Sequence, residues 1–209
     1  MANLEPLIQS IPVAPLKLAS LEGCRTLADQ VNNYLVSFRH ESPTNVGQAD
    51  SLQGYCADSY LLECECPRFG SGEGKGVLKE SVRGCDLFIM VDITNYSLTY
   101  RVNGYENHMS PDNHYQDLKR IISAADGKAR RINVIMPFLY EGRQHKRSKR
   151  ESLDCALMLQ ELVDMGVSNI LTFDAHDPRV SNSIPLHGFD SFMPTYQFLK
   201  ALVNSVPDF

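Results

Sequence analysis

The chain has 209 residues, 43% hydrophobic and 22% charged, and carries a formal net charge of -5 at pH 7. This composition is typical of a soluble globular protein with one large domain, or with one domain and part of a second. No apolar stretch near the N-terminus is long enough for a signal peptide or a membrane span, so we expect a cytoplasmic protein with no membrane partner. The acidic balance argues against a general nucleic-acid binder.

Six cysteines are scattered along the sequence, and several fall in expected core elements. Only Cys64 and Cys66 lie close together, and no second pair stands at the spacing of a metal finger, which argues against a zinc site. We therefore expect all six to be reduced thiols.

The chain begins with the pattern of a strand followed by a helix. Residues 16–20 form a short apolar run typical of a strand, and the spacing of apolar residues predicts a helix over residues 22–38. The apolar side chains that recur at helical spacing are Leu27, Val31 and Leu35.

Less regular sequence follows, with one strand inside it. Residues 39–53 are mostly polar and broken by proline and glycine, which predicts a mobile insertion. The next expected strand is residues 60–66. Residues 69–76 are rich in glycine, which allows a backbone to approach a ligand closely. The run lacks the Gly-Lys-Ser/Thr ending of a P-loop, which excludes that phosphate cradle, and Phe69 taken alone would suit a core aromatic under a turn.

The middle of the chain predicts a buried strand, a long connection and a helix. Residues 85–91 are strongly apolar, as a buried strand would be. Residues 94–111 carry three tyrosines and His108, and we interpret them either as an insertion at a subunit surface or as a lid. A helix is expected at residues 112–125, with the polar side chains of residues 112–114 as its caps. Its inward positions are Tyr115, Leu118, Ile121 and Ile122.

The clearest unit of the sequence lies in residues 132–177. Apolar runs at residues 132–138 and 169–173 flank an amphipathic helix at residues 152–165, which is the pattern of a βαβ unit with parallel strands and a right-handed crossover. We expect Ser152 to cap this helix and Gly166 to end it. The stripe expected to face the sheet is Leu153, Ala156, Leu157, Leu159, Leu162 and Val163.

Two polar loops leave the carboxyl ends of these two strands. Open parallel sheets form their ligand crevice at such ends, so the loops should face one site. The first loop holds five cations within eight residues: Arg143, Lys146, Arg147, Lys149 and Arg150. Such close like charges repel unless an anion offsets them, and a polyphosphate is the obvious partner. A solvated surface loop or a nucleic-acid patch is the alternative interpretation.

The second loop is the turn Asp174-Ala-His-Asp177, in which two carboxylates surround one imidazole. A divalent cation bound to phosphates takes ligands of this kind, and Mg²⁺ usually takes only one or two from the protein. The alternative is a purely hydrogen-bonded turn, because Asp177-Pro178 is a common turn start. Beyond it we expect residues 184–192 to continue the fold and an amphipathic helix at residues 195–203. Together these elements predict an α/β fold, an open and mostly parallel sheet flanked by helices.

These residues resemble the ribose-phosphate diphosphokinase (phosphoribosyl pyrophosphate synthetase) family. The nucleotide-binding half of that family has a strand ending in proline, a Tyr-x-Arg-Gln-Asp-Lys-Lys loop and a later Asp-Leu-His. The corresponding stretches here are residues 132–137, Tyr140-Glu-Gly-Arg-Gln-His-Lys146 and Ile170-Leu-Thr-Phe-Asp-Ala-His176. Phe69-Gly-Ser-Gly-Glu73 resembles the family's Phe-Ser-Asp-Gly-Glu, and Glu80-Ser-Val-Arg-Gly84 matches its Glu-Ser-Val-Arg-Gly. Each motif is weak alone, but their order and spacing together are specific.

The resemblance implies transfer of the diphosphoryl group of ATP to the 1-hydroxyl of ribose 5-phosphate, with Mg²⁺ bridging phosphate oxygens. By this likeness ATP is bound by Arg143, Gln144, His145 and Lys146, and His176 is the catalytic residue that meets the metal or the γ-phosphate. His145 stands where the family has an acid, and Ala175 where it has leucine.

The resemblance also assigns a role to the glycine-rich loop. Phe69 is expected to stack on adenine and Glu73 to hydrogen-bond near its amino group, with Ser71 in place of the family's middle acid. In the family this loop often comes from a neighbouring subunit, so a homo-oligomer is expected, and the family forms hexamers.

The likeness covers only the first half of the family pattern. It implies an ATP-binding, phosphoribosyltransferase-like domain at residues 1–190, and the start of a second, missing domain at residues 191–209. The pentose-phosphate loop, the pyrophosphate loop and the basic catalytic loop belong to that second domain, so we expect this chain to be inactive alone. Two alternatives stay open: a non-catalytic regulatory homologue, and a basic-loop interaction module that recognises nucleic acid or protein.

Overall fold

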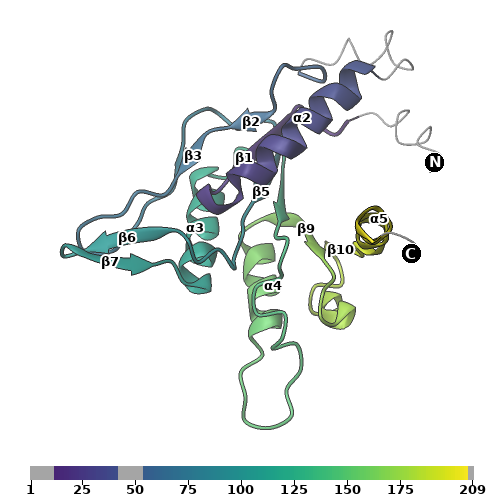
Figure 1. The fold of residues 1–209 in the computed structure, drawn as a ribbon. Helices are drawn as coiled ribbons and strands as arrows, with labels where there is room; N and C mark the ends of the chain where they lie inside the picture. The colour runs from purple at the N-terminus through teal and green to yellow at the C-terminus, as the bar shows by residue number, and fades with distance from the viewer. Residues whose placement is uncertain (1–11, 42–53, 207–209) are drawn as a thin grey trace.

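A parallel sheet in the order β10-β9-β8-β5-β1-β2 runs through the part of the chain that the computed structural model describes, residues 12–41 and 54–206 (Figure 1). All neighbouring strands in this sheet are parallel, which confirms the expected open α/β architecture. The strands are β1 (Leu16–Ser20), β2 (Leu61–Leu62), β5 (Asp86–Met90), β8 (Arg131–Ile135), β9 (Val167–Phe173) and β10 (Gly188–Phe192).

Helices cover the two faces of the sheet unequally. A short 3-10 turn, η1 (Glu22–Cys24), leads into α2 (Arg25–Glu41), which packs on one face through Cys24 and Ala28 against Leu18 and Met90. The opposite face carries the larger core, made with α3 (Pro111–Ala124) and α4 (Asp154–Asp164). The connection after β1 and the connection after β5 therefore leave to opposite faces of the sheet.

Two small antiparallel pairs project from one side of this body (Figure 1). One pair is β3 (Cys64–Glu65) with β4 (Val77–Leu78), and the other is β6 (Thr99–Val102) with β7 (Tyr105–His108). The two tips touch, because the backbone N–H of Asn103 donates to the carbonyl of Gly70 at 3.2 Å. The expected single strand at residues 60–66 is wrong: β2 pairs with β1, whereas β3 turns away to pair with β4.

A row of polar side chains crosses the sheet face on the side of α2. Asp86 accepts a bidentate pair of hydrogen bonds from Arg131, and also one from the Asn133 amide at 2.7 Å. The side-chain oxygen of Asn133 in turn accepts from the side-chain amide of Asn169 at 2.6 Å. Gly188 lies next in the row, where any Cβ would collide with the Asn169 side chain. These partners satisfy Asn133, which is only 1% exposed.

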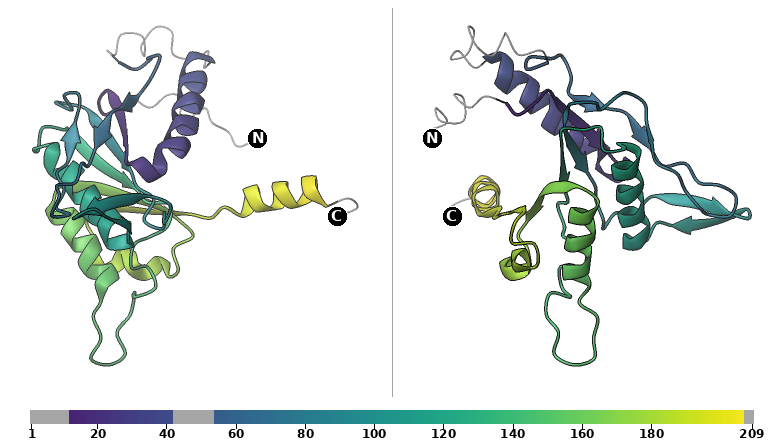
Figure 2. Two further views of the ribbon diagram at one scale, coloured as in Figure 1. Left: turned by 60° about the vertical axis from the view of Figure 1, so that its left-hand side comes forward. Right: turned by 180° about the vertical axis from the view of Figure 1, so that it is seen from behind.

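The C-terminal elements lie at the far edge of the sheet. After a second 3-10 turn, η2 (Pro178–Ser183), β10 leads to α5 (Thr195–Ser205), which extends away from the body (Figure 2). No residue of α5 is buried. Its exposed apolar side chains are Tyr196, Phe198, Leu199, Leu202 and Val203. The expected helix at residues 195–203 is confirmed, and it runs slightly longer.

Two expected helix starts are corrected by the structure. Helix α4 begins at Asp154, and the Ser152 hydroxyl donates to the Asp154 carboxylate at 2.5 Å instead of accepting from backbone amides. Helix α3 is capped by Ser110, whose hydroxyl accepts from the Asn113 amide at 3.2 Å, and not by residues 112–114. His114 is buried, and its Nε2 lies 2.6 Å from the Asn95 carbonyl oxygen.

The buried stripe of α4 also differs from the expected one. It consists of Cys155, Met158, Leu159 and Leu162. Leu157, expected to face the sheet, is 59% exposed, because the inward residues recur at the i, i+3, i+4 and i+7 positions from Cys155. Gly166 ends the helix with φ of 93°, as expected. The inward face expected for α3 is confirmed.

Three further expectations concern the insertion, the cysteines and membrane-spanning helices. Helix α2 extends into the first residues of the expected insertion 39–53, and the rest of that insertion lies outside the described residues. All six cysteines are free thiols. Among residues 12–41 and 54–206, no helix is both long and apolar enough to cross a membrane.

Candidate functional site

The tips of β8 and β9 carry the two polar loops and are held side by side. Beyond the regular ladder, the Met136 amide donates to the Leu171 carbonyl at 2.9 Å and the Phe173 amide donates to the Pro137 carbonyl at 3.3 Å. The loop of residues 141–153 hangs from this edge below α4 (Figure 1), and the turn of residues 174–177 leaves the adjacent strand. The βαβ unit thus places both loops at one end of the sheet, as its sequence predicts.

The cationic loop is closed by Gln144. Its side-chain amide donates to the Ser152 carbonyl at 2.7 Å, and its own carbonyl accepts from the Cys155 amide at 3.3 Å. These bonds join the two limbs of the loop just before α4 begins. The Gln144 side chain therefore shapes the loop, in addition to any contact that it makes with a ligand.

His145 joins the loop to the turn. Its ring lies 5.1 Å from the His176 ring, centroid to centroid, in an edge-on arrangement with 60° between the planes. Its Nε2 lies 3.5 Å from the Asp177 carboxylate, while its Nδ1 lies 3.2 Å from the Arg143 carbonyl oxygen. The two loops therefore contact each other.

The turn itself is rigidly anchored. The Asp174 amide donates to the Phe192 carbonyl, and the Ala175 amide donates to the Ser191 hydroxyl, both at 2.9 Å. Asp174 adopts a left-handed backbone with φ of 44°. The Asp177 carboxylate accepts from the Arg179 side chain and backbone, and these bonds hold the pKa of Asp177 well below its usual range. Asp177 is therefore a carboxylate at any physiological pH.

The cations of the loop point into solvent. Arg143, Lys146, Arg147, Lys149 and Arg150 are all exposed. Glu151 accepts from the Ser148 amide and hydroxyl, so this acid is already used within the loop. The loop thus presents a dense positive charge that an anion can reach, beside the imidazole of His176, which is also exposed.

Two stacked tyrosines support the start of this loop, and the sequence did not predict this contact. The Tyr140 hydroxyl donates to Asp112 at 2.5 Å, and its ring stacks on Tyr115 with centroids 4.6 Å apart. The Tyr115 hydroxyl donates to Glu161 at 2.7 Å. Burial raises the pKa of both tyrosines, so both stay protonated donors. Tyr140 opens the family-like motif, which was the one sequence signal for this brace.

The turn suits a metal ion that arrives with phosphates. No cluster of three or more His, Cys, Asp or Glu side chains able to hold a metal occurs in the described ranges 12–41 and 54–206. Asp177 is engaged by Arg179, which leaves the exposed Asp174 and His176 as donors. One or two protein ligands is what Mg²⁺ usually takes when phosphate oxygens and water complete its shell.

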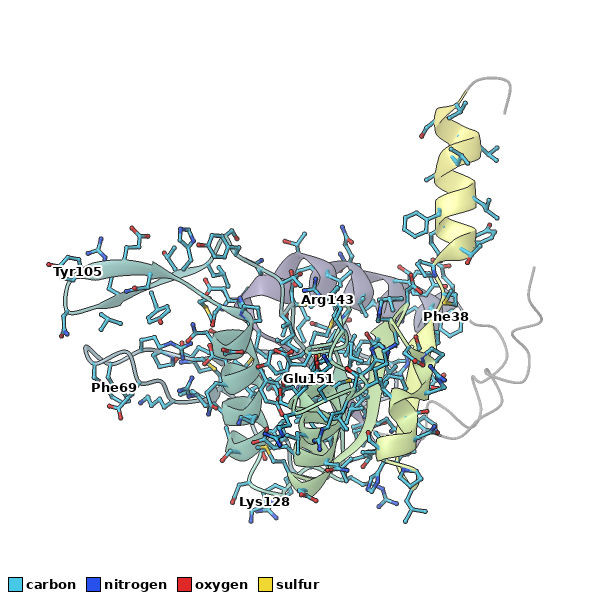
Figure 3. All side chains as sticks on the ribbon, turned by 90° about the horizontal axis from the view of Figure 1, so that it is seen from below. Phe38, Phe69, Tyr105, Lys128, Arg143 and Glu151 are labelled. Carbon is cyan, nitrogen blue, oxygen red and sulfur yellow. The ribbon has the colours of Figure 1, made fainter. Side chains whose placement is uncertain are left out.

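The glycine-rich loop lies elsewhere. Phe69 sits at the tip of the projection, far from Arg143 (Figure 3). It is 54% exposed, so the interpretation as a core aromatic is wrong. The Ser71 hydroxyl donates to the Glu73 carboxylate at 2.8 Å, and the Phe69 amide donates to the Glu73 carbonyl at 2.7 Å. Within one chain, Phe69, Ser71 and Glu73 therefore do not share a site with residues 143–146 and His176.

Sequence comparisons identify the relatives of this chain. The family model for the N-terminal domain of ribose phosphate pyrophosphokinase matches residues 16–166. Ribose-phosphate pyrophosphokinase from Corynebacterium ammoniagenes is 29% identical over 167 residues, which is 79% of this chain and 41% of that protein. The enzyme of the same name from Bacillus caldolyticus is 30% identical over 122 residues, 57% of this chain and 34% of the relative. This chain thus spans less than half the length of these relatives.

A solved structure shares the fold. The crystal structure of phosphoribosylpyrophosphate synthetase from Mycobacterium smegmatis matches with a TM-score of 0.65 and 22% sequence identity, over 91% of this chain and 52% of that chain. At this identity the likeness concerns the fold, and it confirms the expected phosphoribosyltransferase-like architecture. Because the family model covers well over half of its residues, this chain belongs to the ribose phosphate pyrophosphokinase family and corresponds to the family's N-terminal domain.

Proposed function

We propose that this chain is the ATP-binding half of a ribose-phosphate diphosphokinase. The observation that carries the proposal is the contact between His145 and His176, which joins a cationic loop to a metal-compatible turn at the tips of two adjacent strands. Family membership supplies the reaction class. The alternative of an interaction module that binds nucleic acid through its charge alone has no need of this second loop.

The exposed cations supply the contacts to the triphosphate. Arg143 offers a planar pair of donors to phosphate oxygens, and Lys146 adds a point charge. His145 places its ring between the loop and Asp177, and Gln144 keeps the two limbs of the loop together. His176 and Asp174 are the side chains that would hold Mg²⁺, and the ion would offset negative charge on the phosphates.

The proposed reaction transfers the β- and γ-phosphoryl groups together. The 1-hydroxyl oxygen of ribose 5-phosphate forms a bond to the β-phosphorus, the bond from that phosphorus to the α,β-bridging oxygen breaks, and AMP leaves. The hydroxyl proton passes to solvent or to a base. Catalysis of in-line transfer rests on positioning and on neutralising the phosphate charge, which is what the loop residues of this chain contribute.

In this proposal, two parts of the complete site lie outside the ATP loops of a single chain. The pentose-phosphate loop belongs to the family's second domain, so the division of the chain near residue 190 and the inactivity of the chain alone stay predictions. The adenine end of ATP is met by Phe69 and Glu73 of a second copy, because Phe69, whose amide bonds to the Glu73 carbonyl, lies far from Arg143 of its own chain (Figure 3). The protein would therefore work as a homo-oligomer.

Calorimetric titration of the purified chain with ATP and Mg²⁺ tests the binding half of the proposal. We expect saturable binding that weakens about 10-fold in Arg143→Ala, since a charge-assisted phosphate contact is lost. Lys128→Ala is the matched control, because it removes an exposed positive charge well away from Arg143 (Figure 3) and should leave the affinity unchanged. Equal ATP affinities of the two variants would contradict the proposal. So would a chain that does not bind ATP and binds nucleic acid instead, with an affinity that falls steeply as the salt concentration rises.

A rate assay tests the predicted incompleteness of the chain. With ATP, Mg²⁺ and ribose 5-phosphate, the 209-residue chain should release no AMP above the uncatalysed background. Release at an enzymatic rate would show that all catalytic groups lie within this chain and would refute the half-enzyme assignment.

A further inference from the structure

A cavity lies apart from the two loops that follow β8 and β9. Its volume is about 450 Å³, and its walls come from the segment after β1, the segment around β3, the hairpin strand β6 and helix α3. None of the residues given a role in ATP binding lines it. Cavities of this size hold small organic ligands in many proteins.

The cavity occupies the topological switch point of the sheet. Strands β1 and β5 are neighbours, and the chain leaves β1 toward α2 on one face and leaves β5 toward α3 on the other. Leu21 and Glu22, which directly follow β1, line the cavity together with Leu98 from the segment after β5. In open α/β sheets, ligands bind in the crevice outside the carboxyl ends of the strands at such a point. The proposed ATP loops leave this crevice free.

The cavity lining holds three arginines and three acids, and cations just outside it pair with two of those acids. Asp117 accepts hydrogen bonds from two guanidinium groups, Arg68 at 2.5 and 2.8 Å and Arg120 at 2.6 Å, so this cluster keeps one surplus positive charge. Arg25 and Arg101 also line the cavity, and neither forms an ion pair with any other residue in the ranges 12–41 and 54–206.

Besides Asp117, two more acidic side chains lie on the walls. Glu65 is already paired with Lys79 at 2.6 Å, and Glu22 is the other acid. Together with Arg120 and Lys79, which pair with Asp117 and Glu65 from outside the lining, five cations stand against three acids, so the region favours an anion. Arginine forks match the oxygens of a phosphate group.

Arg68 leaves one donor unused at this wall. Its side chain is only 9% exposed, and its guanidinium lies over the Tyr100 ring at 5.3 Å from the centroid. Two of its nitrogens bond to Asp117, but Nε is buried and has no hydrogen-bond partner among the described residues. Because no solvent reaches this atom, a ligand in the cavity does not reach it either, and contacts to a ligand must come from exposed arginines such as Arg25 and Arg101.

The rest of the lining is neutral and partly apolar. Leu21, Met109 and the Tyr100 ring offer surface for an organic group. Burial raises the pKa of the Cys64 thiol to about 11 and that of Cys66 to about 12, so both line the cavity as neutral thiols and do not repel an anion. A ligand with one charged end and one apolar end fits this division of the walls.

We propose that the cavity binds a small phosphate monoester, with its phosphate at Arg25 and Arg101 and its organic part against Leu21, Tyr100 and Met109. This site is separate from the ATP loops and does not depend on the function proposed for them. Because β6 forms one wall and its hairpin tip touches Gly70, occupancy would also restrain the glycine-rich loop.

Nuclear magnetic resonance of the nitrogen-15-labelled chain tests this site. The probes are inorganic phosphate, ribose 5-phosphate and adenosine monophosphate, added separately. We expect saturable shifts of the amide signals of residues 64–66, 68 and 98–101, with at least one ester binding more tightly than inorganic phosphate. Equal affinity for all three probes would refute recognition of an organic group, and shifts confined to residues 141–153 would refute the site.

A pair of double variants completes the test. Arg25→Gln with Arg101→Gln should weaken ester binding at the cavity about 10-fold or more, because two phosphate contacts are lost. Lys128→Gln with Arg130→Gln removes the same charge from an exposed region outside this cavity and should change nothing. Since all four side chains are exposed, folding should persist, and the amide spectrum itself reports it. Equal weakening in both pairs would mean general attraction of anions and would overturn the proposal.

Discussion

The imidazole of His145 packs edge-on against that of His176, with the ring centroids 5.1 Å apart. One ring belongs to the cationic loop after β8 and the other to the turn after β9, so a change in either loop reaches the other through this contact. Asp177, bonded to Arg179 and close to His145, completes the link. The geometry of the proposed ATP site therefore depends on both loops at once.

Replacing Arg179 should change the ionisation of Asp177. Hydrogen bonds from Arg179 lower the pKa of this carboxyl group, so they stabilise the folded chain above the ordinary carboxyl pKa of about 3.9, and that contribution is lost as the pH falls through the native value. In Arg179→Gln the native pKa should rise toward the ordinary value. Carbon-13 titration of the Asp177 carboxyl group measures it, with Arg147→Gln as the control; an unchanged pKa would show that Arg179 is not the cause.

Tyr140→Phe should loosen the start of the cationic loop. The variant keeps the ring that stacks on Tyr115 but loses the hydroxyl that donates to Asp112 at 2.5 Å. We expect the free energy of unfolding to fall by about 1 kcal/mol, and ATP affinity to fall with it, as the loop is less well positioned. Urea denaturation and calorimetry give the two values. Tyr34→Phe, at a tyrosine that is 69% exposed, should alter neither.

Gly76→Ala should separate β4 from α3. A Cβ at this position would collide with the backbone carbonyl of Arg120, which cannot move without disturbing the helix. Such overpacking costs about 1–3 kcal/mol of unfolding free energy, measurable by urea denaturation. Gly70→Ala is the matched control, because a Cβ there meets nothing within 4 Å and should cost little. Equal losses in the two variants would show that the close approach is unimportant.

Asn133→Ala should be costly although this residue has no role in the proposed ATP site. The change removes one donor to Asp86, which keeps its bonds from Arg131, and takes the acceptor from the Asn169 side-chain amide. We expect a loss of about 2 kcal/mol in the free energy of unfolding. Asn107→Ala, in the exposed strand β7, provides the comparison and should lie within about 0.5 kcal/mol of the parent chain.

Much of the fold follows from local patterns in the sequence. The unit from β8 to β9 could be predicted because two apolar runs flank a periodic helix. Since the two strands are parallel, the loops at residues 141–153 and 174–177 then had to lie at the same end of the sheet. The hairpin of β6 and β7 was missed because β7 is exposed throughout and lacks apolar alternation, and the alternation in β6 extends over only four residues. Its signal was the pair Asn103-Gly104, both with positive φ, which is typical of a two-residue hairpin turn.

Other features depend on distant contacts that no local pattern carries. The split of residues 60–66 between two sheets follows from pairing with β1 and β4, and the bond from Tyr140 to Asp112 joins residues on different elements. The polar row through Asp86 and Asn133 interrupts strands that otherwise look uniformly apolar. Within the site, the meeting of the two loops followed from the strand order, whereas the contact of His145 with His176 and the closing of the loop by Gln144 did not.

Helix α5 has a practical consequence for handling this protein. Its side chains Tyr196, Phe198 and Leu199 are 52–70% exposed, and Phe192, the last residue of β10, is 50% exposed. Apolar patches of this kind drive proteins together or onto surfaces. Solutions of the chain should therefore scatter more light as they are concentrated, and mild detergent or a charged substitution on α5 should keep them clear.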